Sequence, residues 1–163
     1  MTPYGTEQGF DTWFNANGYT LPSGSPDLAA LLNRGSQYID AVYGSRFVGR
    51  VEDPLQERQW PRDGAIVNGK AFPSGVVPTA VINASYYAAY QEATAPGSLS
   101  AVGSTVSTVK REKVGQLEVE YQSHQSDGTA LGITPLISMV DGMLAPYLRD
   151  LSQPSIGIWS IGC

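Results

Sequence analysis

The sequence predicts a mainly α-helical fold: a small bundle of about four helices with an inserted β-hairpin, an extended loop and an extended C-terminal arm. Apolar residues recur three and four positions apart in several segments, each beside a capping or helix-breaking residue. A further segment alternates apolar and charged residues, which is typical of a hairpin. With 163 residues, 42% of them hydrophobic, the chain is long enough for one core that needs no disulfide or structural metal.

The clearest helix signals lie between residues 25 and 44. Ser25 is the expected N-cap, Pro26 suits the first helical position because it has no N–H to satisfy, and Gly44 follows the last periodic residue. The apolar residues of this helix form one stripe that we expect to be buried: Leu28, Leu31, Leu32, Gly35, Ile39 and Val42.

Similar signals predict the other helices. One covers residues 7–16 after the capping residue Thr6. Another begins at Pro78 and ends at Pro96-Gly97, and the last begins at Thr134-Pro135. The helix after Pro78 has a face of small residues that permits close approach of a neighbouring helix: Val81, Ala84, Ser85, Ala88 and Ala89.

Residues 45–75 show no helical period and contain several prolines and the turn pair Asn68-Gly69. We expect this segment to be irregular, with one small hairpin over residues 66–71. Irregular stretches of roughly 30 residues are uncommon in compact domains and are often ordered by a partner. The sequence therefore predicts a contact with another subunit here.

The inserted hairpin is predicted over residues 105–122. Gly115-Gln116 is the expected turn, because a type II′ turn favours glycine at its first central position. This turn sets the register of the two strands. Apolar residues then pair on one face of the hairpin, and oppositely charged residues pair on the other face. The expected pairs are Val114 with Leu117, Lys113 with Glu118, and Arg111 with Glu120.

The overall charge opposes tight binding to a phosphate backbone. The chain has 10 Lys and Arg against 15 Asp and Glu, a net charge of -5 and a pI near 4.7. Lys110, Arg111 and Lys113 form a basic cluster, but the carboxylates across the hairpin largely neutralise it. The only cysteine, Cys163, and the lack of a signal sequence or long apolar run lead us to expect a protein of the cell interior without membrane contact.

No constellation in the sequence predicts an enzyme, a metal site or a cofactor. His124 is the only histidine, so a zinc site would depend on carboxylates. A Ser-His-Asp arrangement with Asp127 stays open in principle, but the sequence lacks a nucleophile elbow and any glycine-rich phosphate motif. We expect His124 to be an exposed loop residue and Glu52-Asp53 to be solvated surface carboxylates.

Aromatic residues offer two further candidates. Trp60 lies between Arg58 and Arg62, which could stack on the indole ring or bind a carboxylate of a partner. A tyrosine cluster follows Pro78, but its nearest charge is Glu92, and base stacking on single strands usually combines aromatic with basic residues. We therefore assign this cluster to core or subunit packing: Tyr86, Tyr87 and Tyr90.

Two parts of the chain differ in character. Residues 1–151 are expected to form one helical domain, and residues 152–163 a C-terminal docking tail. Chain ends are usually polar, whereas this tail is apolar, so it is expected to bind a partner. Its anchor residues are Ile156, Ile158, Trp159 and Ile161.

The order of several motifs resembles a family of tailed-phage head-tail connector, or adaptor, proteins that is often labelled DnaT-like single-stranded DNA-binding protein. The resemblance covers residues 10–149 and departs from the family at Gln116, where many relatives have proline. The motifs are SQYIDAVYGSRFVGR (36–50), QWPR (59–62), VPTAVINASYYAAY (77–90) and VKREKVGQLEVEY (109–121).

The resemblance implies a structural protein of the virion neck, without catalytic residues or cofactors. Such adaptors assemble in the host bacterial cytoplasm as a homo-oligomeric ring, typically a dodecamer, beneath the portal protein. The ring extends the DNA channel and joins the capsid to the tail. The implied partners are the portal, further copies of the chain, a head-closure or tail-completion protein, and genomic double-stranded DNA that passes through without specific binding.

The resemblance also implies roles for the residues singled out above. The apolar tail is expected to bind the portal. The expected subunit-interface residues are Arg58, Trp60, Arg62, Lys110, Arg111, Lys113, Glu118 and Glu120. Two alternatives stay open: a single-stranded DNA-binding protein, which the acidic pI opposes, and another neck component such as a head-closure protein.

Overall fold

The computed structural model describes residues 2–100, 112–114, 117–119 and 138–149. The mainly α-helical fold with a small β-hairpin is confirmed. The helices are α1 (Glu7–Ala16), α2 (Leu28–Tyr43), α3 (Thr79–Thr94) and α4 (Ser138–Leu144), with 3-10 turns η1 (Gly44–Arg46) and η3 (Ala145–Tyr147). The strands are β1 (Arg50–Val51), β2 (Arg62–Asp63), β3 (Ile66–Val67), β4 (Lys70–Ala71), β5 (Glu112–Val114) and β6 (Leu117–Val119).

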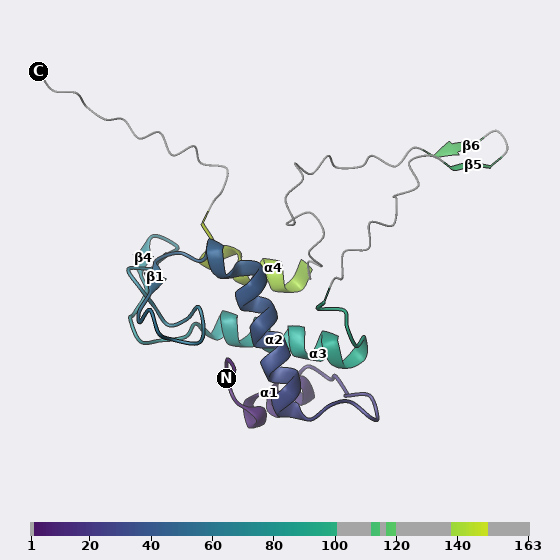
Figure 1. Cartoon of the computed structure of the whole chain (residues 1–163), viewed down its shortest axis with the longest axis horizontal. Coiled ribbons are helices and arrows are strands. Elements are labelled where there is room, and N and C mark those ends of the chain that lie inside the picture. The colour runs from purple at the N-terminus through teal and green to yellow at the C-terminus, as the bar shows by residue number, and fades with distance from the viewer. Residues whose placement is uncertain (1, 101–111, 115–116, 120–137, 150–163) are drawn as a thin grey trace, which may run out of the picture.

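Helices α2 and α3 form the centre of the body and cross each other in close contact (Figure 1). Gly35 lies at the crossing, where a Cβ atom would collide with the carbonyl oxygen of Ser85 and with Ala89 on α3. Ser36 and Ser85 are fully buried and share a hydrogen bond of 2.9 Å between their hydroxyls. The predicted small-residue face of α3 is therefore the surface that lets the two helices approach.

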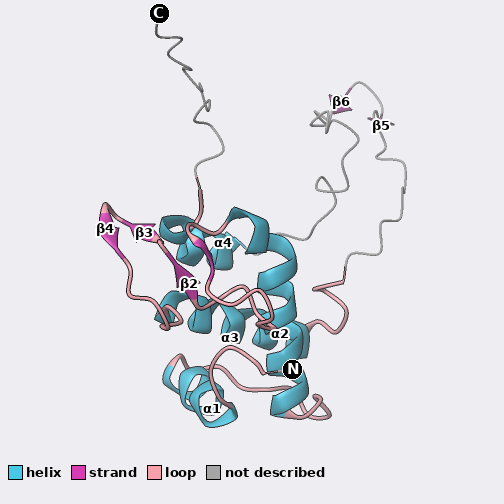
Figure 2. Cartoon of the chain, turned by 60° about the vertical axis from the view of Figure 1, so that its left-hand side comes forward, coloured by secondary structure: helices cyan, strands magenta, loops and turns pink. Residues whose placement is uncertain are grey.

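Helix α1 covers one end of this pair, toward the bottom of Figures 1 and 2. The hydroxyl of Thr6 accepts a hydrogen bond from the N–H of Gly9, which confirms Thr6 as the N-cap. Phe10 and Phe14 are buried against α2 and α3, because they lie on the same face of α1. Their neighbours in this cluster are mainly Leu31, Leu32, Tyr86, Ala89 and Ala93.

The start of α2 differs from the prediction by two residues. Asp27 is the N-cap, because its carboxylate accepts a hydrogen bond of 2.7 Å from the N–H of Ala30. The hydroxyl of Ser25 instead donates to the carbonyl of Pro22 and closes the preceding turn. At the other end, α2 ends at Tyr43 with Gly44 as its C-cap, as predicted, and Gly44 then begins the 3-10 turn η1.

Helix α4 and residues 45–75 cover the opposite end of the α2–α3 pair (Figure 2). Trp60 is the largest fully buried side chain of this cluster, with edge-on contacts to Phe47, Phe72 and Tyr147. The helix α4 ends at Leu144, and Pro146 lies in η3, as its missing N–H requires. The predicted start at Thr134-Pro135 lies outside the described residues.

The hairpin over residues 66–71 is confirmed. Ile66 pairs with Ala71 and Val67 with Lys70, and both residues of the Asn68-Gly69 turn have positive φ, as a type I′ turn requires. A second pair of short strands, β1 and β2, was not predicted, because two-residue strands leave no alternating pattern in the sequence.

The register of the larger hairpin is confirmed where it is described. Lys113 pairs with Glu118 and Val114 with Leu117. The turn Gly115-Gln116 and the pair Arg111–Glu120 lie outside the described residues. In the part of the chain that the structure describes, no helix is long and apolar enough to span a membrane.

Candidate interaction surfaces and the buried polar junction

A buried polar junction ties the N-terminal segment and residues 56–62 to α2. Arg58 is nearly buried, with its Nη1 atom 3.4 Å from the Oδ2 atom of Asp40, and its Nε–H donates to the carbonyl of Thr2 at 2.7 Å. The Tyr4 hydroxyl donates to the other oxygen of Asp40 and accepts from the backbone N–H of Trp60. Residues far apart in the sequence are thus held by one shared carboxylate.

The environment of this junction shifts the pKa values of its groups. Burial raises the pKa of the Asp40 carboxyl above its ordinary value, and the hydrogen bonds from Tyr4 and from Gln59, together with the charge of Arg58, oppose the shift. Burial, together with the Asp40 charge, also raises the pKa of the Tyr4 hydroxyl. The raised pKa values of Asp40 and Tyr4 thus result from the burial of two groups that bind each other. This is typical of a structural junction.

Arg62 holds a second set of bonds. Its guanidinium donates to the carbonyls of Val48, Gly49 and Gln59 at 2.9 to 3.1 Å. Burial, with a further contribution from the charge of Arg149, lowers its pKa. These bonds tie β2 to the segment before β1 and to the end of the β1–β2 loop.

The predicted Trp60 cluster therefore has a different arrangement from either option weighed in the sequence. Neither arginine is placed over the indole ring in the manner predicted: the Arg58 guanidinium lies over the ring of Tyr4, and that of Arg62 over the ring of Phe47. The carboxylate that Arg58 binds is Asp40 of the same chain. Within the single chain, Arg58, Trp60 and Arg62 act as core residues, and their predicted place at a subunit interface stays a prediction.

An exposed apolar side chain lies near this junction. Leu55 is 89% exposed, although its backbone is held by a compact turn. The Asp53 carboxylate accepts from the N–H of Leu55 at 2.8 Å, and the Asp53 carbonyl accepts from the N–H of Gln56 at 3.0 Å. The turn therefore fixes the backbone that presents a leucine to solvent.

A mainly apolar groove lies beside this turn, with a volume of about 440 Å³. It runs between the N-terminal segment, residues 55–61 and the start of α3, and Leu55 forms part of its rim. Its apolar lining comes mainly from Pro3, Tyr4, Pro61, Val77 and Ile82.

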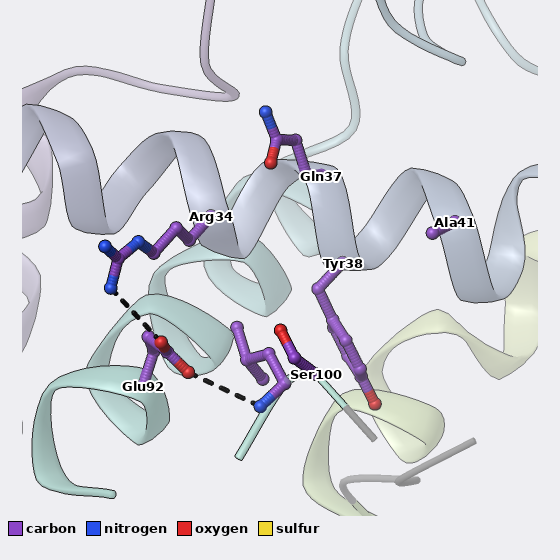
Figure 3. Close-up of a pocket in the computed structure, with 7 residues that line it drawn as sticks. Arg34, Gln37, Tyr38, Ala41, Glu92 and Ser100 are labelled. Atoms are coloured by element: carbon purple, nitrogen blue, oxygen red, sulfur yellow. Dashed lines mark hydrogen bonds and ion pairs between the residues drawn. The ribbon is translucent and has the colours of Figure 1, made fainter. Parts of the chain in front are cut away.

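A second cavity, of about 560 Å³, lies between α2 and the C-terminal end of α3 (Figure 3). The Nη1 atom of Arg34 is 3.2 Å from the Oε1 atom of Glu92, and half of the Arg34 side chain is exposed. Glu92 is buried and also accepts from the N–H groups of Gly97 and Leu99, so its charge fixes the turn after α3. The other residues that line the cavity are Gln37, Tyr38, Ala41, Leu99 and Ser100. We call this cavity the α2–α3 socket.

The tyrosine cluster after Pro78 lies on α3, as predicted, and packs against α1 and the loop that follows it. Tyr86 is buried, and its hydroxyl accepts from the N–H of Thr6. Tyr90 stacks on Tyr19 with ring centroids 4.6 Å apart, and Tyr87 meets the edge of Trp13. These rings contact one another, which agrees with a packing role.

Several predicted site residues lie outside the described part of the chain. They are the anchor residues Ile156, Ile158, Trp159 and Ile161, the hairpin residues Lys110, Arg111 and Glu120, and also His124 and Asp127. For Lys113 and Glu118 only the backbone pairing is described. Among the described residues, no group of three or more His, Cys, Asp or Glu side chains is placed to hold a metal ion.

Asp40, Tyr4 and Leu55 were not predicted as special positions. Asp40 is one of several polar residues on α2, and nothing in the sequence shows that Arg58 binds it. Leu55 carried a weak signal, since it is one apolar residue in the polar run Glu52 to Arg58. Its exposure depends on the turn made by Asp53 and could not be predicted from composition.

The structure thus defines a small, mainly helical protein whose buried ionic groups hold its own segments together. A protein-family model described as "Putative DnaT-like ssDNA binding protein" matches residues 3–159, and the chain belongs to this family. No curated protein and no solved structure matches the chain.

Proposed function

We propose that the chain is a structural head-tail connector of a tailed bacteriophage, which forms a ring under the portal and extends the DNA channel. The observation that carries the proposal is the motif order of residues 36–90, which resembles such adaptors. Residues 36–50, 59–62 and 77–90 contribute to one core around the α2–α3 crossing. The quoted motifs are therefore parts of one structural unit.

The chemistry of the described residues also supports a structural role. The most buried ionic groups, Arg58, Arg62 and Glu92, are bound to other side chains of the same chain or to backbone N–H and carbonyl groups. A general acid or base needs a titratable group that faces a substrate. These groups face their own chain.

Net charge supports the conduit part of the proposal. A channel that DNA crosses must not retain it, and a net charge of -5 per copy repels a phosphate backbone. The implied partners are those of the resemblance: the portal, further copies of the chain, and a head-closure or tail-completion protein.

Electron microscopy of the purified protein mixed with the portal of the same phage tests this proposal. We expect a ring on one face of the portal. A variant shortened to residues 1–151 is expected to keep its helical circular dichroism and to lose the portal, because the removed tail contains the apolar anchors. A protein that stays monomeric with and without the portal would contradict the proposal.

The family description favours a second candidate function, binding of single-stranded DNA. Fluorescence anisotropy of a labelled oligonucleotide at low ionic strength separates the two. Genuine binding would weaken steeply as salt is added, and alanine substitutions at Lys110, Arg111 and Lys113 would reduce the salt dependence. We expect no anisotropy change, because the net charge is negative. Tight, salt-sensitive binding would replace the connector proposal with this one.

A further inference from the structure

The turn around Leu55 has the properties of a knob that inserts into a partner. An exposed leucine alone is ordinary, but this one stands on a backbone fixed by the side chain of Asp53. A fixed backbone loses little entropy on binding, so an apolar side chain on it gains most of its burial energy. The turn is also acidic, since Glu52, Asp53 and Glu57 are all exposed beside the leucine.

The α2–α3 socket has complementary properties. It is a concave site, and Ala41 and Leu99 supply apolar wall while Arg34 supplies a half-exposed guanidinium at its edge (Figure 3). The guanidinium has several N–H donors in a planar fork, so it can bind Glu92 and a second carboxylate together. A leucine flanked by carboxylates therefore matches this socket in shape and charge.

The knob and the socket are two separate patches of the surface. In Figure 1 the strands of residues 45–75 lie on the left, and the C-terminal end of α3 lies on the right. The groove beside Leu55 reaches Val77 and Ile82 at the start of α3, whereas the socket includes Glu92 and Leu99 at its end. Ile82 and Glu92 are ten residues apart on α3, which is about 15 Å along the helix, so a single molecule presents two distinct patches.

We propose that the Leu55 turn of one copy of the chain inserts into the α2–α3 socket of the next copy. Two different patches give a head-to-tail contact, which generates a ring when the rotation between copies closes. The inference rests on the ring of the proposed function and names the residues that build it.

The groove beside Leu55 suggests the main competing arrangement. If Leu55 entered the same groove on a second copy, one patch would serve both partners, and the contact would close as a two-fold dimer. A two-fold dimer leaves no free patch for further copies. The two arrangements therefore differ in the size of the assembly and in which variants complement each other.

Blocking each half of the contact separately tests the inference. Leu55→Asp removes the knob and leaves the socket, whereas Ala41→Trp fills the socket and leaves the knob. Native mass spectrometry is expected to show loss of the wild-type ring for each variant alone and a dimer, but no ring, when the two are mixed. Ile66→Asp is the matched control, because Ile66 is also exposed, at 62%, but lies on the β3–β4 hairpin; it is expected to keep the ring.

Each outcome decides between the ideas. A ring in both blocked variants overturns this inference and leaves the connector proposal intact. If the wild-type chain never assembles, alone or with the portal, the connector proposal fails and this inference fails with it. Circular dichroism melts of all variants show whether a lost ring reflects a lost fold; if Ala41→Trp unfolds, Arg34→Glu takes its place as the socket variant.

Cross-linking distinguishes the head-to-tail contact from the two-fold one. With Cys163→Ser removing the native thiol, the pair Leu55→Cys and Ala41→Cys is treated with a short bismaleimide. A ladder of covalent multimers is expected for the double variant and only monomer for each single variant. Dimers from Leu55→Cys alone would indicate the two-fold arrangement and overturn the inference.

Charge reversal gives a third readout. Glu52→Arg and Arg34→Glu are each expected to weaken assembly several-fold, because each places like charges at the contact. Glu52 is exposed, so its substitution leaves the turn intact. Restored assembly in a mixture of the two variants, or in the double variant, supports the contact. Equal assembly of all these variants counts against it.

Discussion

The α2–α3 pair and residues 45–75 are packed into the body by different kinds of contact. The helices approach through the absence of side-chain atoms, with Gly35 against the backbone of Ser85. Residues 45–75 lack long elements and are fixed by guanidinium groups, since Arg58 and Arg62 bind carbonyls and one carboxylate. Regular elements can pack by shape, whereas an irregular segment needs a specific polar partner for its backbone.

The largest expected effect comes from removing the polar contacts that fix residues 45–75. Arg58→Ala leaves the partly buried Asp40 carboxylate without its cation, and we expect a loss of about 3 kcal/mol in the free energy of unfolding. Urea denaturation followed by circular dichroism measures it. Arg34→Ala is the matched control, because the Arg34 guanidinium is half exposed and Glu92 keeps its two backbone N–H donors, so the loss should be about 1 kcal/mol or less. Equal losses would mean that burial of the Asp40 pair is unimportant.

The shape-based half should break next. Gly35→Ala places a methyl group against the carbonyl oxygen of Ser85, and we expect a loss of about 2 kcal/mol as the helices separate. Gly142→Ala in α4 is the control, since a Cβ atom there meets nothing nearby and the substitution favours helix. The two thermal midpoints should move in opposite directions. An unchanged thermal midpoint for Gly35→Ala would show that the two helices can move apart at the crossing without loss of stability.

The pH dependence of stability should then test the polar contacts around Asp40. The folded state raises the pKa of Asp40, so it binds that proton more tightly than the unfolded state does. The contribution of this group to stability is therefore full at low pH, falls as pH rises from the ordinary value of 3.8 to the raised folded pKa, and is constant above it. Urea midpoints across this window are expected to show that decline in the wild type but not in Asp40→Asn. An identical decline in both proteins would assign it to other groups.

The smallest expected effect concerns the exposed turn. Leu55→Ser should change the free energy of unfolding of the monomer by less than about 0.5 kcal/mol, because the side chain is 89% exposed. The same urea denaturation checks it. A large loss would place Leu55 among the residues that hold the turn together.

Sequence patterns predicted the regular half of the molecule well, for identifiable reasons. Thr6 caps α1 because a short hydroxyl side chain can reach an unpaired N–H, and the stripe of α2 follows from helical spacing. The cap of α2 was misplaced because Ser25 and Asp27 are both good caps, and only the path of the preceding turn decides between them.

The irregular half could not be predicted in the same way. Which carboxylate Arg58 meets depends on the fold of more than one segment, so no local pattern contains the answer. The Asn68-Gly69 turn is the exception. Its positive φ angles are a local requirement, and the Asn-Gly pair in the sequence predicts them directly. The Leu55 turn is an intermediate case, because its backbone depends on the local Asp53 turn and the exposure of Leu55 depends on how distant segments fold.

The claim that this chain works as a ring-forming structural protein is tested most directly by native mass spectrometry of the purified protein with the portal of the same phage. The account predicts a defined multimer of the chain bound to the portal, without nucleic acid. A monomer that ignores the portal and instead binds single-stranded DNA in a salt-sensitive manner would contradict it.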